Sequence, residues 1–124
     1  MEQLNKFFSM SEEEKEVMLR YLPGPYTFIV DGRGEFEGKR IGVRVPDHYF
    51  SRKLALELGR PVISTSANIS GKESPSCVEE IENGVAEQTA IIVDGGHCKY
   101  GEGSTVVDIK NNKIIRQGAG KFTF

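Results

Sequence analysis

Apolar residues recur along this chain with helical spacing in two stretches. In the first, Ser11 followed by Glu14 forms a capping box, and the apolar stripe after it must end at Pro23. In the second, Asp47 is the expected N-cap, and Gly59 is the expected stop because a proline follows it closely. The apolar residues of the two stripes are Val17, Met18 and Tyr21, and Phe50, Leu54 and Leu58. The pattern therefore predicts two amphipathic helices.

Shorter apolar runs lie between turn signals and predict strands. Residues 41–45 alternate, with Arg44 on the side opposite the valines, as in a strand with one polar face. A third capped helix is expected to start at Ser76 with Glu79, and a hairpin is expected across residues 111–112. The predicted strands are residues 26–30, 41–45, 61–65, 90–94, 104–109 and 113–118. Strands that alternate with helices before a terminal hairpin indicate an α/β domain with a mixed sheet.

Composition narrows the class of protein without identifying a partner. A chain of 124 residues with 38% hydrophobic content is expected to form one soluble globular domain. Its net charge of −2 gives no general attraction to nucleic acid or anionic membranes, and no apolar run approaches the roughly 20 residues that cross a bilayer. The N-terminal residues lack the pattern of a signal peptide, and Cys77 and Cys98 are not in a C-x-x-C arrangement. A reducing cytosol is therefore the expected setting.

Small polar residues gather where predicted strands begin or end. Residues 64–68 read Ser-Thr-Ser-Ala-Asn at the end of an apolar run, and Ser104 follows a glycine-rich loop at residues 95–103. Arg116 lies near the end of the last predicted strand, and Arg44 lies within an earlier one. In open α/β sheets ligands collect outside the carboxyl ends of strands, and hydroxyl, amide and guanidinium groups suit phosphate and carboxylate oxygens.

Each of these features also has an ordinary structural interpretation. The Ser/Thr/Asn cluster fits turn and capping chemistry, and an arginine on a strand is commonly solvated or ion-paired. The glycine-rich loop is most simply a flexible connection, and His97 beside Cys98 makes a poor metal site. The chain has no nucleophile elbow and no Walker A loop. The residues alone therefore indicate an α/β domain and leave open whether it has an anion or nucleotide site.

Several segments, taken in order, resemble the YrdC family, which includes threonylcarbamoyl-AMP synthase. They run from about Leu19 to Gly120. The combination of STSANISG and STVVD at their proper separation is specific, whereas PGP or DGG alone would be weak. The matching segments are LPGPYTFIV, IGVRVPDH, GRPVISTSANISGK followed by ESPS, IIVDGG, GSTVVDI and IIRQGAG. The resemblance implies a twisted, open mixed sheet with flanking helices.

The resemblance also implies an activity and a set of site residues. Enzymes of this family join L-threonine, bicarbonate and ATP, the last as its Mg complex, to give threonylcarbamoyl-AMP and pyrophosphate, and no tightly bound cofactor is implied. The product serves modification of the adenosine beside the anticodon of certain tRNAs. The threonine-binding residues implied by motif are Arg44, which would hold the carboxylate, with Ser64 and Ser104. The ATP-binding residues implied by motif are Ser66 and Asn68, which would form the catalytic pair at the phosphates, with Ser74 and Arg116.

One part of the family's site has no counterpart in this sequence. The family uses an upstream Lys-x-Arg pair, and the basic residues at 39–40 and 52–53 have neither that spacing nor that place in the order. Residues 1–124 are therefore expected to form a single, partial domain that corresponds to the C-terminal portion. The hypotheses left open for its origin are a fragment, half of a split enzyme with an N-terminal companion chain, or a degenerate relative. The alternative function is an RNA- or nucleotide-binding module without catalysis, with double-stranded RNA or tRNA as its partner.

Two further expectations follow from the resemblance. Without the upstream segment, a sheet edge or an apolar face would be uncovered, which favours a homo-oligomer. The related carbamoyl-adenylate chemistry of hydrogenase maturation is disfavoured, because the zinc-finger-like cysteines of those longer chains are absent here.

Overall fold

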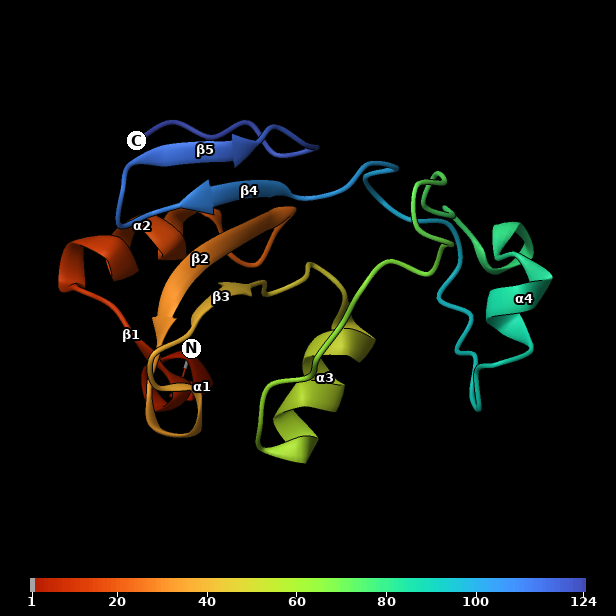
Figure 1. Ribbon diagram of the computed structural model, residues 1–124, viewed down its shortest axis with the longest axis horizontal. Coiled ribbons are helices and arrows are strands. Elements are labelled where there is room, and N and C mark those ends of the chain that lie inside the picture. Colours follow the sequence, from red (N-terminus) through yellow and green to blue (C-terminus); the bar gives the residue numbers. More distant parts are fainter. Residues whose placement is uncertain (1) are drawn as a thin grey trace. The chain divides into compact units, whose positions relative to one another are not determined.

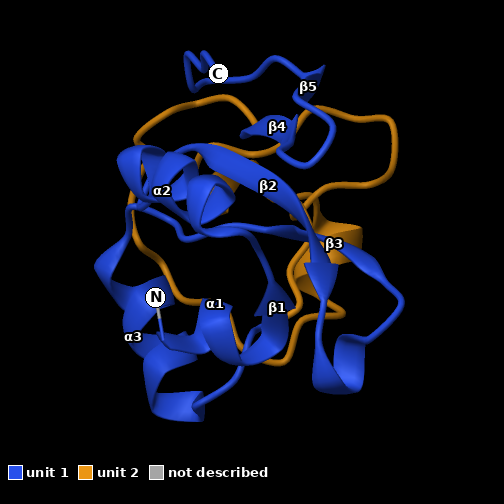
Figure 2. Cartoon of the chain, turned by 90° about the vertical axis from the view of Figure 1, so that its left-hand side faces the viewer, with its two compact units in different colours: residues 1–62, 104–124 blue, residues 63–103 orange. Residues whose placement is uncertain are grey.

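The computed structural model describes residues 2–124 and divides the chain into two compact units (Figure 2). Unit 1 comprises residues 1–62 and 104–124, and unit 2 comprises residues 63–103. The elements of unit 1 are α1 (Glu2–Phe7), β1 (Phe8–Ser9), α2 (Glu12–Tyr21), β2 (Tyr26–Gly32), the 3-10 helix η1 (Gly34–Phe36), β3 (Arg40–Val43), α3 (Tyr49–Leu58), β4 (Thr105–Asp108) and β5 (Lys113–Arg116) (Figure 1). The elements of unit 2 are the 3-10 helix η2 (Val78–Glu80) and α4 (Asn83–Ala86). The interpretation of residues 1–124 as one partial domain stays a prediction.

The strands of unit 1 form one five-stranded sheet with β2 at its centre. Phe28 of β2 lies opposite Val107 of the parallel strand β4 and, on its other side, opposite Val43 of the antiparallel strand β3. The strand β5 runs antiparallel to β4, and the short β1 runs antiparallel to the end of β2. The predicted mixed sheet is therefore confirmed, whereas α1 and β1 were not predicted.

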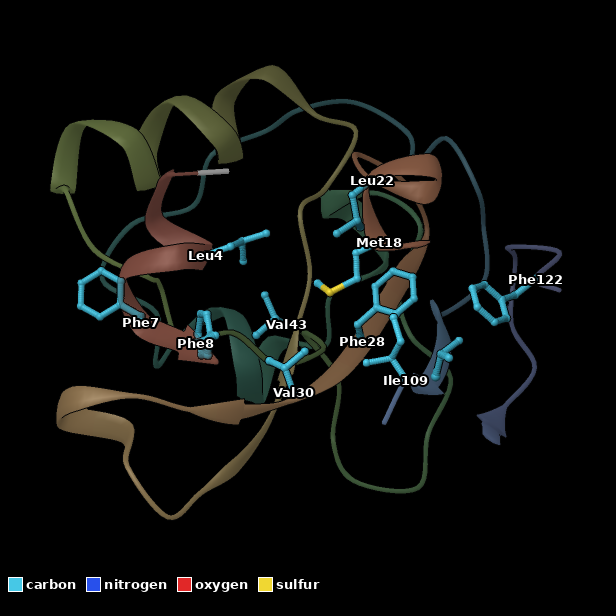
Figure 3. Packing of buried hydrophobic residues seen from close by; sticks show 11 residues of the cluster. Leu4, Phe7, Phe8, Met18, Leu22, Phe28, Val30, Val43, Ile109 and Phe122 are labelled. Carbon is cyan, nitrogen blue, oxygen red and sulfur yellow. The ribbon is translucent and has the colours of Figure 1, made fainter. Parts of the chain in front are cut away.

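One face of this sheet forms the hydrophobic core of unit 1 (Figure 3). Phe28 and Val107 are completely buried, and so is Met18, which α2 supplies to the same cluster. The buried apolar residues are Leu4, Phe7, Phe8, Met18, Leu22, Phe28, Val30, Val43, Val107, Ile109 and Phe122. Because successive side chains along a strand point to opposite faces, the neighbours of Phe28, Val43 and Val107 belong to the other face of the sheet.

The termini of the two long helices follow from their capping residues. Ser11 Oγ accepts a hydrogen bond from the Glu14 backbone N–H at 3.2 Å, and the Glu14 carboxylate accepts one from the Ser11 N–H at 2.7 Å. The helix α2 then ends at Tyr21, before Pro23, as predicted. The helix α3 ends at Leu58, and its C-cap residue Gly59 has a φ of 65°, the left-handed conformation that glycine adopts at low cost. Among the described residues, no helix has the length and apolar character needed to cross a membrane.

The start and the surroundings of α3 differ from the sequence-based expectation. Its N-cap residue is His48, and the predicted N-cap residue, Asp47, instead lies 3.6 Å from the guanidinium of Arg52. The carboxylate of Asp47 therefore forms an ion pair with the first turn of α3, one residue before the N-cap. The apolar stripe of α3 is not buried, because its residues Phe50, Leu54 and Leu58 are 45%, 41% and 55% exposed.

Two of the predicted strands are wrong. Residues 61–65 and 90–94 have no regular secondary structure, and Ile63 and Ile91 are 97% and 78% exposed. A strand is stabilised by backbone hydrogen bonds to a neighbouring strand and by burial of at least one face. Within the described residues no strand pairs with either segment. The apolar runs therefore had the composition of buried strands but lack the neighbours that would make them so.

The capped helix predicted at Ser76 is also wrong. The chain forms the short 3-10 helix η2 with Cys77 as its N-cap residue. The Ser76 N–H donates to the carboxylate of Glu80 at 2.7 Å, and not to that of Glu79, so the reciprocal contacts of a capping box do not form. The inward residues expected of this helix, Val78 and Ile81, are only half-buried.

Candidate functional site

The sheet face opposite the core, the polar face, carries the candidate residues of unit 1. Strand pairing places Thr27 of β2, Val106 of β4 and Arg116 of β5 in one row across the sheet. On the other side of β2, the antiparallel register with β3 puts Arg44, the first residue after that strand, level with Thr27. Since paired residues point to the same face, the row runs from Arg44 at one edge of the sheet to Arg116 at the other.

Ser104 lies directly before β4 and is held from two sides. Its Oγ lies 2.6 Å from Thr27 Oγ1, and its backbone carbonyl accepts a hydrogen bond of 2.8 Å from Arg116 Nη2. Ser104 is only 7% exposed. Unit 1 therefore brings Ser104 and Arg116, which the sequence assigned to different ligands, into direct contact.

Two arginines at the edge strand β3 have different surroundings. Arg40 is committed to the protein, because its guanidinium donates to both carboxylate oxygens of Asp108 at 2.8 and 2.7 Å and lies 3.3 Å from Asp31. Arg44 is exposed, and among residues 2–124 its side chain makes neither a hydrogen bond nor an ion pair. As predicted from the alternation, Val43 is buried and Arg44 is exposed, although Val45 is only half-buried and β3 ends at Val43, two residues before the predicted end. Its guanidinium therefore has donors for a ligand.

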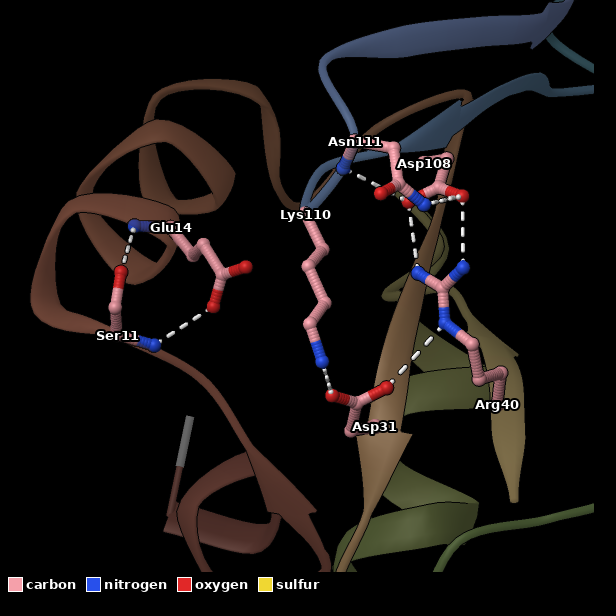
Figure 4. A network of polar contacts seen from close by, with 7 residues as sticks. All are labelled: Ser11, Glu14, Asp31, Arg40, Asp108, Lys110 and Asn111. Carbon is pink, nitrogen blue, oxygen red and sulfur yellow. Dashed lines mark hydrogen bonds and ion pairs between the residues drawn. The ribbon is translucent and has the colours of Figure 1, made fainter. Parts of the chain in front are cut away.

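The Arg40 contacts belong to a wider charged network on the polar face (Figure 4). Asp108 also accepts hydrogen bonds from the Asn111 backbone N–H at 3.2 Å and from Asn111 Nδ2 at 2.9 Å, while Lys110 donates to Asp31. The Arg40 hydrogen bonds lower the pKa of Asp108 well below its usual range, with a further contribution from Asn111. The hydrogen bond from Lys110 is the main cause of the lowered pKa of Asp31.

Two residues of this face were not singled out from the sequence, Thr27 and Asp108. For Asp108 a signal existed, because a carboxylate between the valines and an isoleucine of a predicted strand needs a partner if it is buried. For Thr27 the pattern gave none, since threonine is ordinary in a strand. Its contact with Ser104 arises from parallel pairing between segments 77 residues apart, which periodicity does not reveal.

The remaining candidates, Ser64, Ser66, Asn68 and Ser74, lie in unit 2, where the three serines are exposed and Asn68 is half-buried. Asn68 closes a local turn, because its Nδ2 donates to the carbonyls of Ile69 and Lys72 at 3.1 and 2.9 Å. Ser74 Oγ donates to Asn68 Oδ1 at 3.4 Å, so these two candidates are in contact. The structural interpretation of this segment, turn chemistry, therefore holds for Asn68, and its role toward ATP stays a prediction.

The shallow hollows of unit 1 lie away from these candidates. One of about 200 Å³ is lined by Asn5, Phe8, Ser9, Met10, Glu12, Lys15 and Arg33. A second of about 220 Å³ lies on the exposed side of α3 and is lined by Tyr49, Arg52, Lys53 and Leu56. Neither of these two hollows includes a candidate residue.

Comparison with known proteins assigns the family. Residues 1–118 match the Sua5/YciO/YrdC family model, whose description is telomere recombination, and the chain belongs to this family. A relative from Vibrio vulnificus, named threonylcarbamoyl-AMP synthase, is 30% identical over 116 residues, which are 89% of this chain and 62% of that protein. A relative from Methanocaldococcus jannaschii is 38% identical over 117 residues, 91% of this chain and 55% of its own. The chain thus spans a little over half the length of these relatives.

Solved structures of the family share this fold. E. coli YciO superimposes with a TM-score of 0.83 and 29% identity, over 97% of this chain and 63% of that one. P. abyssi Sua5 gives a TM-score of 0.82 and 30% identity, over 95% of this chain and 39% of that one. A crystal structure of P. abyssi Sua5 complexed with L-threonine gives a TM-score of 0.73 and 34% identity, over 87% of this chain and 34% of that one. The expected YrdC-like mixed sheet is therefore confirmed.

Proposed function

We propose that this chain supplies binding groups for L-threonine and ATP in the synthesis of threonylcarbamoyl-AMP. The observation that carries the proposal is that Arg44, Ser104 and Arg116 lie on one face of the sheet, although 72 positions in the sequence separate the first from the last. Relatives named threonylcarbamoyl-AMP synthase and a related structure that holds L-threonine support it.

Arg44 is the group proposed to hold the threonine carboxylate. A guanidinium presents a planar fork that matches the two oxygens of a carboxylate, and such charge-assisted pairs are stronger than neutral hydrogen bonds. Arg44 is exposed, and its side chain has no partner among the described residues, so binding a carboxylate breaks no existing ion pair. Arg116, at the other end of the row, would contact the nucleotide, and its bond to the Ser104 carbonyl fixes its position.

The proposed reaction is a nucleotidyl transfer. A carbamate oxygen, formed from the threonine amine and bicarbonate, attacks the α-phosphorus of Mg-ATP, and the bond to the leaving pyrophosphate breaks. Such a step needs positioning and stabilisation of charge, which hydroxyl, amide and guanidinium groups provide without a nucleophilic side chain. Ser66, Asn68 and Ser74 are proposed as ATP ligands from unit 2 by their motif, and Ser64 as a threonine ligand.

The cellular context is part of the same proposal. The product would serve modification of the tRNA adenosine beside the anticodon. A reducing cytosol is the proposed setting, because Cys77 and Cys98 are both free thiols.

Titration calorimetry with L-threonine tests the proposal on the wild type and on Arg44→Lys. Lysine keeps the charge but loses the bidentate fork, so the affinity should fall about tenfold or more. Arg20→Lys is the matched control, since Arg20 is exposed on α2 and outside the polar face. Failure of the wild type to bind L-threonine would refute the proposal, and equal affinities in the wild type and Arg44→Lys would remove Arg44 from the site.

A further inference from the structure

The hydroxyl that the polar face presents beside Arg44 is that of Thr27. Thr27 Oγ1 and Ser104 Oγ are hydrogen-bonded at 2.6 Å. Ser104 is 7% exposed, whereas Thr27 is only half-buried. Of these two hydroxyl-bearing residues, Thr27 is therefore the more accessible one on this face.

The position of Thr27 in the sheet matches a role in binding. Thr27 lies in the row between Arg44 on one side and Arg116 on the other. Side chains that are level with each other on adjacent antiparallel strands have their Cβ atoms about 4.5–5.5 Å apart, so one carboxylate is able to reach both Thr27 and Arg44.

A glycine keeps the neighbourhood of Thr27 open. Gly42 of β3 is on the same face, and a Cβ added to it would lie 3.0 Å from Thr27 Cγ2. The strand thus has no side chain where one would press against the methyl group of Thr27. The methyl group of Thr27 thus faces Gly42, and its hydroxyl faces Ser104.

The two hydroxyls together supply one hydrogen-bond donor to a ligand. Each hydroxyl has one proton, and one proton is used in the bond between the two oxygens. When the buried Ser104 donates to Thr27, the proton of Thr27 remains to donate outward. A hydroxyl that already accepts a hydrogen bond is also polarised toward donating one.

We propose that Thr27 binds the amino-acid carboxylate together with Arg44, and that Ser104 acts through Thr27 as a positioning residue. This inference rests on the proposed function, because it assumes that the carboxylate lies at Arg44. It also assigns different roles within the site. Thr27, which the sequence motifs did not mark, contacts the ligand in place of the buried Ser104.

The test is L-threonine calorimetry on the full chain with variants of both residues. Thr27→Val keeps the shape but removes the hydroxyl, and it should weaken binding about tenfold or more. Thr27→Ser should restore most of that loss. Ser104→Ala should have a smaller effect than Thr27→Val, and adding Ser104→Ala to Thr27→Val should cost little more, because the two residues act as one unit.

Two further measurements separate a role in binding from a role in folding. The affinity for ATP should stay within about twofold in Thr27→Val, and thermal unfolding should show that the variant is folded. Thr27→Ala replaces it if the valine variant does not fold. Thr89→Val is the matched control, because the Thr89 hydroxyl bonds only locally, to the carbonyl of Val85, in unit 2.

The outcomes distinguish this inference from the proposed function. No binding of L-threonine by the wild type would overturn both. Wild-type binding that Thr27→Val leaves intact would overturn only the role of Thr27. Independent, additive losses in Thr27→Val and Ser104→Ala would show that Ser104 contacts the ligand directly, which also overturns the inference.

Discussion

The guanidinium of Arg40 and the carboxylate of Asp108 form two parallel hydrogen bonds, of 2.8 and 2.7 Å, that join β3 to β4 across β2. Asp108 is 6% exposed, and Asn111 donates to the same carboxylate, so all of its partners are protein groups that the sheet itself positions. Arg40 and Asp108 therefore serve the structure of the polar face, whereas the side chain of Arg44, four residues after Arg40, makes no hydrogen bond or ion pair among the described residues.

Asp108→Asn should destabilise unit 1. An amide replaces an ionised acceptor, so one of the two guanidinium bonds is lost and a donor is placed against a donor. The loss of hydrogen bonds to a nearly buried group typically costs about 1–3 kcal/mol. Urea unfolding followed by circular dichroism measures the change. Glu37→Gln, at an exposed carboxylate after η1, is the control, and an equal free energy of unfolding for both variants would contradict the prediction.

Acid should weaken the fold through Asp108 and Asp31. The pKa values of both carboxyl groups lie below the ordinary 3.8, because Arg40 bonds the first and Lys110 the second. The unfolded chain then binds more protons than the folded chain in acid, so the stabilisation is complete above the ordinary pKa and is lost as the pH falls toward the native pKa. Urea midpoints should be level near neutrality and should fall from about pH 5 downward. In Asp108→Asn this fall should be shallower, and an unchanged slope would assign the acid sensitivity to other groups.

Gly120→Ala should lower the free energy of unfolding, although replacing glycine by alanine at some other positions leaves it unchanged or raises it. A Cβ at Gly120 would lie 2.4 and 2.5 Å from ring atoms of Tyr26, and the Gly120 carbonyl accepts from the buried Thr105 hydroxyl, so the backbone cannot easily move away. Overpacking of this kind costs about 1–3 kcal/mol. Gly84→Ala is the matched control, because Gly84 lies in α4 with open space around its Cα, and alanine there should be neutral or slightly stabilising. Equal urea midpoints for the wild type and Gly120→Ala would contradict the predicted clash.

The predictable part of the fold consists of elements whose stabilising contacts are local. The capping box at Ser11 and Glu14, and the left-handed stop at Gly59, each involve residues close in sequence, and both formed as expected. The hairpin of β4 and β5 belongs to the same group, with Asn112 at a φ of 48° in its turn. For such elements the sequence contains all of the interacting groups.

The unpredictable part depends on long-range neighbours. The runs at 61–65 and 90–94 have the composition of buried strands, yet Ile63 is 97% exposed, because a strand also needs a paired backbone. The assignment of Asp47 as an N-cap is a local error of one residue, since the N-cap residue of α3 is His48. At the candidate site, Arg44 was found by its alternation with the valines, but Thr27 was missed because its contact with Ser104 spans the sheet.

Arg116→Ala should weaken nucleotide binding. The loss of one charge-assisted contact typically costs about 1.5–3 kcal/mol, or roughly tenfold to a hundredfold in affinity. Since Arg116 also holds the Ser104 carbonyl, the affinity for L-threonine should fall as well, but by less. Calorimetry with ATP and with L-threonine measures both. Lys113→Ala, at the other end of β5, is the control, and an unchanged affinity for ATP in Arg116→Ala would remove Arg116 from the nucleotide site.

The 124-residue chain on its own should not synthesise threonylcarbamoyl-AMP at a useful rate. Its sequence has no counterpart of the family's Lys-x-Arg pair, which would face the ATP phosphates as pyrophosphate leaves. Removing even one preorganised donor from such a site commonly costs about a hundredfold to a thousandfold in rate. Lys72 is a poor substitute, because its ammonium group is already paired with Glu82 at 2.7 Å.

Release of phosphate from L-threonine, bicarbonate and Mg-ATP in the presence of pyrophosphatase measures this turnover. The assay should be repeated with a segment of a relative that contains the Lys-x-Arg pair, supplied as a separate chain, which should raise the rate if the two parts assemble. Lys121→Ala tests whether another cation replaces the missing pair, since Lys121 is exposed and lies outside the residues that match the family model. Fast turnover by the 124-residue chain alone, lost in Lys121→Ala, would show that this lysine replaces the missing pair, and the prediction of an inactive chain would be wrong.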